Sequence, residues 1–186
     1  MGRVIAQQWV SVDGLVAGPN GEVDIFEAVA DFADSETHNR ALLETVDEIL
    51  LGRRTFEGFR DYWPTADDEP MAEPINRIAK TVCSSSLTDM SWGEFAPARV
   101  VRDGVAHAEE RRGATGDTIV WGSIELMGSL LAAGALDELE LFVAPVVVGS
   151  GRRLLGEDTP VTRLQLTESE TWSGGVVRVR YALAAA

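Results

Sequence analysis

Two adjacent arginines follow a short apolar run, at a point where the chain begins to look helical. Residues 49–51 are Ile-Leu-Leu, and Gly52 separates them from Arg53, Arg54 and Thr55. A strand that passes through glycine into a helix leaves free backbone N–H groups and the positive end of the helix dipole facing outward. Arginine adds a forked cation that matches phosphate. The stretch therefore indicates an anion site; the alternative is that Thr55 only caps the helix and the arginines are solvated.

Two other segments have the same design. Residues 80–83 run into Ser84 and Ser85, and residues 117–121 run into Gly122 and Ser123. The carboxyl ends of parallel strands meet at one edge of a sheet, where ligands bind in open α/β folds. Arginines, hydroxyls and exposed amides together would suit a nucleotide with several phosphates. The chain has no Gly-x-Gly-x-x-Gly after a strand and no Gly-Lys-Ser/Thr loop, which argues against a common dinucleotide fold and a common ATPase.

The elements that must position these residues follow from apolar patterning. We expect an α/β fold with a mixed sheet, mostly parallel, ending in an antiparallel pair and flanked by helices, as a single domain over residues 1–186. Ser35 is the expected N-cap of the second helix. The expected strands are 4–12, 49–51, 80–83, 99–102, 117–121, 139–148, 163–171 and 176–183, and the expected helices are 25–33, 35–46, one from Thr55, 71–78, 105–112 and 124–133.

Composition excludes several classes of protein. The formal net charge of -14, from 30 acidic and 16 basic residues, argues against nucleic acid as a partner. One cysteine, Cys83, cannot form an internal disulfide, and two histidines are too few for a histidine-built metal site. The longest apolar stretch is too short to span a membrane, and the N-terminus lacks the apolar core of a signal peptide. We expect a cytoplasmic protein without a metal.

The order and spacing of several motifs identify a family resemblance over nearly the whole chain. The sequence resembles the dihydrofolate reductase-like family, most closely the C-terminal reductase domain of the riboflavin-biosynthesis deaminase–reductase and its stand-alone relatives. The deaminase zinc motif is absent. The resemblance is carried by Ser-Val-Asp-Gly at 11–14, Ile-Leu-Leu-Gly-Arg-Arg-Thr-Phe at 49–56, the serine-ended strand before Leu87, Trp-Gly-Ser at 121–123, Leu-Ala-Ala-Gly-Ala-Leu-Asp-Glu-Leu at 131–139 and Val-Ala-Pro-Val-Val-Val-Gly-Ser-Gly at 143–151.

The resemblance implies an NADPH-dependent reductase, and it assigns cofactor contacts to several groups of residues. The adenosine 2′-phosphate and the pyrophosphate fall to Gly52, Arg53, Arg54 and Thr55, and the adenosine end to Ser84 and Ser85. The pyrophosphate and nicotinamide ribose fall to Gly122, Ser123, Ile124 and Glu125, and the nicotinamide to Val12, Asp13, Gly14 and Ala17. Relatives commonly have a glycine pair or triplet where this chain has Gly122-Ser123, so the Ser123 hydroxyl could shift the cofactor.

The acceptor end is less defined by the motifs. Hydride transfer to a polarised ring needs an acid or a proton-relaying water. Of the nearby carboxylates Asp13, Asp24 and Glu27, Asp13 has the best position; the alternative is a turn-forming aspartate before Gly14. The glycine-rich loop 13–24 is expected to close over the nicotinamide or the substrate. Trp9, Phe56 and Trp63 are candidates for an aromatic wall, or are simply part of the core.

Two functions fit these residues. The first is reduction of a pterin-like or 5-amino-6-ribosylamino-pyrimidine substrate, in the manner of dihydrofolate reductase or 5-amino-6-(5-phosphoribosylamino)uracil reductase. The second is binding of NADP(H) by the same fold without efficient catalysis. The resemblance also implies a homodimer.

Overall fold

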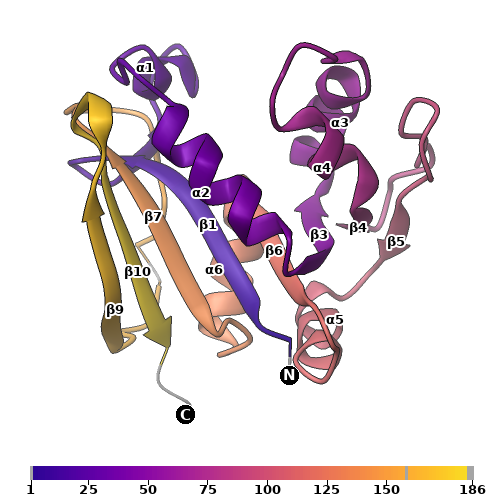
Figure 1. Cartoon of the computed structure of the whole chain (residues 1–186). Coiled ribbons are helices and arrows are strands. Elements are labelled where there is room, and N and C mark those ends of the chain that lie inside the picture. Colours follow the sequence, from indigo (N-terminus) through magenta and orange to yellow (C-terminus); the bar gives the residue numbers. More distant parts are fainter. Residues whose placement is uncertain (1, 158, 184–186) are drawn as a thin grey trace.

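A computed structural model describes residues 2–157 and 159–183 of the protein. Its centre is an eight-stranded sheet in the order β5-β4-β3-β6-β1-β7-β10-β9 (Figure 1). The strands from β5 to β7 are parallel, and β10 and β9 are antiparallel, as predicted. The strands are β1 (Val4–Ser11), β3 (Val46–Gly52), β4 (Ala79–Cys83), β5 (Arg99–Val101), β6 (Asp117–Trp121), β7 (Glu138–Ala144), β9 (Leu164–Thr171) and β10 (Val177–Leu183).

Helices cover both faces of the sheet, because its central strands are apolar on both sides. In Figure 1, α2 crosses the front of the sheet and α6 lies behind it. Ile5 and Leu51 pack with Phe56 on one face, whereas Val4 and Leu50 pack with residues of α5 and α6 on the other. The helices are α1 (Val23–Phe26), α2 (Ala33–Leu43), α3 (Arg53–Tyr62), α4 (Ala72–Arg77), α5 (Gly104–Arg111) and α6 (Ile124–Ala132).

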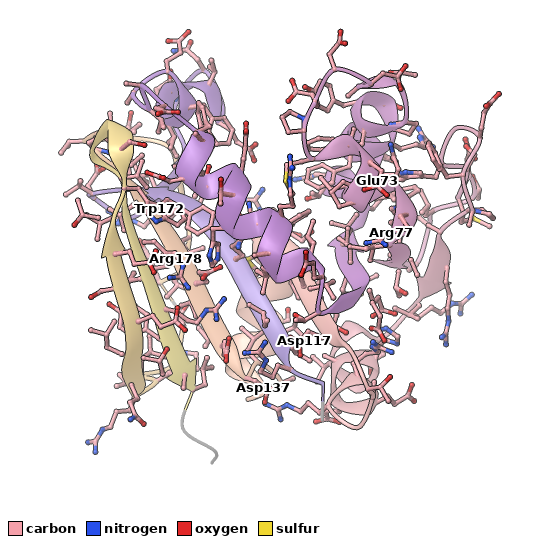
Figure 2. All side chains as sticks on the ribbon, viewed as in Figure 1. Glu73, Arg77, Asp117, Asp137, Trp172 and Arg178 are labelled. Atoms are coloured by element: carbon pink, nitrogen blue, oxygen red, sulfur yellow. The ribbon has the colours of Figure 1, made fainter. Side chains whose placement is uncertain are left out.

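Carboxylates hold the amino ends of the central strands. Asp117 accepts a hydrogen bond from the backbone N–H of Arg3 at 2.9 Å, and Asp137 accepts one from that of Val4 at 2.8 Å. Figure 2 shows both aspartates at the same end of the sheet, near the N-terminus. The carboxyl ends of the parallel strands lie at the opposite edge of the sheet, where α3 follows β3 and α6 follows β6.

Several predicted boundaries were wrong. The first helix covers only Val23–Phe26, and the next begins at Ala33 with Phe32 at its N-cap. Ser35 does not cap that helix, because its hydroxyl donates to the Phe32 carbonyl at 2.8 Å. Likewise Gly52, in extended conformation, precedes α3, so Thr55 lies inside the first turn.

Strand β7 ends at Ala144, four residues before its predicted end, because Pro145 has no N–H to donate to a neighbouring strand. Two short strands were not predicted at all. β2 (Leu15–Ala17), in the loop after β1, pairs with β8 (Arg152–Arg153) as a separate two-stranded sheet. None of the helices in the described part of the chain is long and apolar enough to cross a membrane.

Candidate functional site

Two cavities open at the carboxyl edge of the sheet. The first, of about 550 Å³, lies between α3, α5 and α6, and we call it the arginine cavity. The second, of about 610 Å³, lies between α3 and the segment around α1, and we call it the aromatic cavity. Arg54, Thr55, Gly122 and Arg152 line both cavities, so the two join there. A ligand in one can therefore meet a ligand in the other.

Local sequence explains the floor of the arginine cavity. Gly122 has φ +61°, and a Cβ atom there would lie 2.9 Å from Thr55 Cγ2. Ser123 is buried, and its hydroxyl accepts a hydrogen bond from the Gly52 N–H at 2.7 Å. This bond joins the ends of β3 and β6. The hydroxyl therefore points into the protein, and the serine that departs from the family pattern serves to hold the two strand ends together.

Four arginines line the arginine cavity, which concentrates positive charge in a strongly acidic chain. Arg53 and Arg54 were expected there, whereas Arg102 and Arg152 were not. Arg152 Nη2 lies 3.2 Å from Glu125 Oε1, and Arg54 Nη1 lies 3.9 Å from the same oxygen. The Glu125 side chain is 84% exposed, so both ion pairs are weak. An incoming anion can therefore replace Glu125 as the partner of Arg54 and Arg152.

The N-terminus of α5 closes the far side of the arginine cavity. Asp103 caps this helix, because its Oδ1 accepts hydrogen bonds from the N–H groups of Val105 and Ala106, both at 3.0 Å. Asp103, Gly104 and Val105 all line the cavity. The Asp-Gly pair after the strand is an N-cap pattern that could have revealed this wall from sequence. Of the expected residues, Gly52, Ser123, Ile124 and Glu125 also line the cavity.

The serines after β4 are placed differently from the expectation. Ser84 and Ser85 are not among the residues that line either cavity, although Cys83 lines the arginine cavity. The Ser84 hydroxyl accepts hydrogen bonds from the N–H groups of Ser86 and Leu87. Ser86 in turn accepts a hydrogen bond from Arg53 Nη1 at 3.3 Å. The serine turn thus borders the cavity through Arg53.

The aromatic cavity has flat walls. Trp9 and Trp63 line it as expected, together with Phe26, Phe59, Tyr62 and Trp121. Trp9 and Phe26 meet edge to face, with ring centroids 5.9 Å apart. Phe56 is fully buried beside Trp92 and lies outside both linings, so it belongs to the core. Such a cavity suits a flat, partly apolar ligand.

Asp13 does not line either cavity. Its carboxylate accepts hydrogen bonds from the N–H groups of Val148 at 3.0 Å and Gly149 at 2.7 Å. Hydrogen bonds from Ser11 and from these two amides lower the pKa of Asp13 to about 2. In the structure Asp13 joins two loops as an ionised acceptor, which gives no support to a role as proton donor.

The other loop residues expected at the nicotinamide, Val12, Gly14 and Ala17, also lie outside both linings. Ala17 instead pairs with Arg152 between β2 and β8. The loop after β1 therefore contributes to the site indirectly, by holding Arg152 where the cavities join.

Glu22 is the carboxylate that lines the aromatic cavity, and it is the only acidic side chain that does so within residues 2–157 and 159–183. It lies at the exposed N-terminal end of α1, but the surrounding cavity wall partly buries its carboxyl group. This burial raises the pKa of Glu22, and the positive charge of Arg152 opposes the rise. The sequence does not single out Glu22 from its acidic neighbours, since its position depends on how α1 packs beside β1.

Metal chemistry has no candidate site in the described residues. No three side chains of His, Cys, Asp or Glu gather there in a way that could hold an ion. The polar groups that line the two cavities include arginines, backbone amides and the carboxylates of Glu22, Asp103 and Glu125.

The sheet order and the flanking helices give the chain a dihydrofolate reductase-like α/β fold. The chain belongs to the RibD C-terminal domain family, whose sequence profile matches residues 3–178.

Known proteins resemble the chain over almost its full length. The uncharacterized Bacillus subtilis protein YyaP is 26% identical over 185 residues, which are 96% of this chain and 94% of YyaP. A Shewanella structure named as a riboflavin biosynthesis protein superposes with a TM-score of 0.80 at 20% identity, covering 98% of this chain and 99% of that one. Dihydrofolate reductase from Enterococcus faecalis, solved with NADP(H), has a TM-score of 0.65 at 14% identity over 99% and 98%.

Proposed function

We propose that this protein is an NADPH-dependent reductase that transfers a hydride to a small heterocycle of the pterin or 5-amino-6-ribosylamino-pyrimidine type. The observation that carries the proposal is the junction of the two cavities at Thr55 and Gly122. One cavity offers arginines and the other offers aromatic walls. A phosphate-bearing cofactor and a flat acceptor bound in these cavities would meet at that junction.

The arginine cavity fits NADPH on chemical grounds. The 2′-phosphate and pyrophosphate together carry close to four negative charges, and Arg53, Arg54, Arg102 and Arg152 are matched to them. The positive φ of Gly122 and the absence of a side chain there let backbone amides approach phosphate at the start of α6. When bound, the reduced nicotinamide supplies the hydride.

The remaining task of this chain is to orient the acceptor ring and to deliver a proton. Trp9, Trp63 and Trp121 provide faces on which a flat ring can stack. Glu22, with its raised pKa, is suited to hold a proton near the acceptor or to pass it through a water molecule. Five expected cofactor residues lie outside both cavities and would reach the cofactor only after a loop movement: Val12, Gly14, Ala17, Ser84 and Ser85.

Two similar solved structures support this assignment, because one is named for riboflavin biosynthesis and the other is a dihydrofolate reductase solved with NADP(H). A cytoplasmic homodimer is part of the proposal. All eight residues of the edge strand β9 are exposed, which leaves a free strand edge and exposed side chains for a second copy to cover. Size-exclusion chromatography with light scattering tests the dimer.

The reductase assignment is tested by following NADPH absorbance with purified protein and each of three acceptors: dihydrofolate, a dihydropterin and 5-amino-6-(5-phosphoribosylamino)uracil. We expect oxidation of NADPH that depends on at least one acceptor, and slower oxidation of NADH. Calorimetric titration with NADPH runs in parallel. Tight binding of NADPH without turnover of any acceptor would favour the second candidate, a binding protein of this fold. Absence of binding would contradict both.

A further inference from the structure

A chain of hydrogen bonds runs from a buried charge to the wall of the aromatic cavity. Glu140, on β7, has no exposed surface, and its carboxylate accepts hydrogen bonds from Arg178 at 2.8 Å and Arg180 at 3.1 Å. Gln7, on β1, donates to Glu140 Oε2 at 2.6 Å. Figure 2 shows Arg178 on the hairpin side of the sheet, below Trp172 and beside α2. The network thus runs from the β7–β10 region to Gln7 on β1, and Gln7 lines the aromatic cavity.

Glu140 is an acceptor at every working pH. Burial alone would raise its pKa, but hydrogen bonding and charge from His38, with Gln7 and Arg180, lower it to about 2. An ionised carboxylate has no proton to donate. The Gln7 atom that faces it must therefore be the amide nitrogen.

The other atom of the Gln7 amide can be assigned in the same way. Trp121 Nε1 lies 2.7 Å from Gln7 Oε1, and an indole N–H can only donate. Gln7 therefore has its oxygen toward Trp121 and its nitrogen toward Glu140 and Asn39. This orientation follows from the chemistry of its partners.

Asn39 is oriented in consequence. The Gln7 nitrogen has two protons: one goes to Glu140, and the other goes to Asn39 Oδ1 at 2.8 Å. Asn39 must accept here, so its own NH₂ group is at the other end of the amide. Asn39 lines the aromatic cavity, and among the residues that the structure describes this NH₂ group has no hydrogen-bond partner.

We infer that Asn39 selects ligands of the aromatic cavity that present a hydrogen-bond acceptor, a carbonyl oxygen or an sp² ring nitrogen, toward α2. Glu140 and Gln7 are positioning residues that keep the Asn39 donor turned to the ligand. The inference rests on the proposed function only for the statement that the aromatic cavity takes the acceptor heterocycle. A ligand with a donor at this place would leave the Asn39 NH₂ group unpaired and would be rejected.

The test uses two flat probes of similar size and needs no cofactor. 5,6-Diaminouracil has carbonyl acceptors, whereas 1,2-phenylenediamine has neither carbonyls nor ring nitrogens. Binding is followed by quenching of tryptophan fluorescence, since Trp9, Trp63 and Trp121 line the cavity. Asn39→Asp keeps the oxygen that accepts from Gln7 and replaces the donor with an acceptor. Asn39→Ala removes both, and Gln165→Glu makes the same amide-to-carboxylate change on the exposed strand β9.

We expect Asn39→Asp to weaken 5,6-diaminouracil by about tenfold or more and Asn39→Ala by about two- to tenfold, from the usual strength of such a bond. Asn39→Ala should change the binding of 1,2-phenylenediamine by no more than about twofold. Asn39→Asp should leave this binding unchanged or tighten it, because the new carboxylate can accept from the amine N–H groups, and Gln165→Glu should match the parent protein. Equal changes for both probes would mean that Asn39 only shapes the cavity. No change, or no saturable binding of 5,6-diaminouracil by the parent protein, would also overturn the inference. NADPH oxidation is measured separately, so failure of the reductase proposal is distinguishable.

Discussion

The two cavities meet at Gly122 but are built in opposite ways. The arginine cavity is made of backbone amides and exposed cations: the Glu125 side chain is 84% exposed, and its partners Arg54 and Arg152 are 78% and 44% exposed. The aromatic cavity is supported by buried charge, because Glu140 is fully buried and Arg178 is only 2% exposed. Water and salt screen the first set of interactions strongly and the pairs of Glu140 much less.

This difference suits the two proposed ligands. The proposed cofactor would have to bind and leave in every cycle, and exposed charges would hold it loosely and attract it from a distance despite the net charge of -14. A substrate ring that must be oriented within a fraction of an ångström would lie against a wall in which buried hydrogen bonds fix Gln7 and the orientation of Asn39. Substitutions should therefore produce the larger effects on the aromatic side, and effects that depend on salt on the arginine side.

The largest effect is expected at Glu140. Glu140→Gln removes the fully buried counter-charge of Arg178 and Arg180 and leaves them with partly exposed partners such as Glu168, which costs about 3–5 kcal/mol of stability. Glu170→Gln is the matched control, because Glu170 pairs with Arg178 at 3.3 Å but is 54% exposed, and about 1 kcal/mol or less should be lost. Chemical denaturation measures both. Equal losses would contradict the contrast between buried and exposed charge.

The same variant has a signature in pH. The folded pKa of Glu140, about 2, lies below its ordinary value of 4.5. The ionised form is therefore the one that the fold stabilises: the contribution is complete above pH 4.5 and is lost as the pH falls toward 2. It amounts to about 3 kcal/mol. Glu140→Gln should lack this part of the acid destabilisation, and a parallel pH profile would contradict the prediction.

The second effect concerns the proposed proton donor. Glu22→Gln should lower kcat by about a hundredfold or more, the usual contribution of a general acid. Because burial raises the pKa of Glu22, the parent rate should fall as the pH rises through that pKa, and this limb should vanish in the variant. Glu27→Gln, at an exposed position outside both cavities, is the control. An unchanged pH profile would assign the proton to water.

The sequence predicted the arginine cavity better than the aromatic cavity. The strands of the eight-stranded sheet and most helices were predicted, because apolar runs and their alternation with amphipathic segments are local signals. The arginine cavity was found largely for the same reason, since Gly52 to Thr55 and Gly122 to Glu125 are contiguous segments at strand ends. The wall at Asp103 was not predicted, although the N-cap pattern of Asp103 and Gly104 is a local signal for it.

The aromatic cavity was mostly beyond local signals. Asn39 and Gln7 are far apart in sequence and meet only when α2 packs on β1, and Arg152 reaches the site through the unpredicted pairing of β2 with β8. Asp13 was chosen as the acid because it follows the first strand, yet its carboxylate is used to hold Val148 and Gly149. Which of several acidic residues faces a cavity depends on loop geometry that a single sequence does not encode in a readable pattern.

The third effect tests how the arginine cavity distinguishes cofactors. Arg53→Ala removes one charge-assisted contact, worth about 1.5–3 kcal/mol, so NADPH affinity should fall about tenfold to more than a hundredfold. NADH, which lacks the 2′-phosphate, should be affected much less. Arg163→Ala removes the same charge at an exposed position outside both cavities. Equal losses for NADPH and NADH would mean that Arg53 does not recognise the 2′-phosphate.

The smallest effect, at Glu125, is also the sharpest test of the contrast between the cavities. In the free protein Glu125 faces Arg152 at 3.2 Å and Arg54 at 3.9 Å, so its carboxylate occupies cations that phosphate would use. Glu125→Gln should tighten NADPH by about two- to fivefold at low salt, in keeping with the small worth of exposed ion pairs. The gain should shrink toward nothing at high salt, because these charges are screened.

Glu109→Gln, on the exposed side of α5 and outside both cavities, removes the same charge and controls for long-range repulsion. Titration at two ionic strengths measures both variants. Tighter binding in both would assign the effect to net charge alone. Weaker binding in Glu125→Gln would mean that Glu125 accepts a hydrogen bond from a ribose hydroxyl of the cofactor, so that the carboxylate at the start of α6 is itself part of the binding surface.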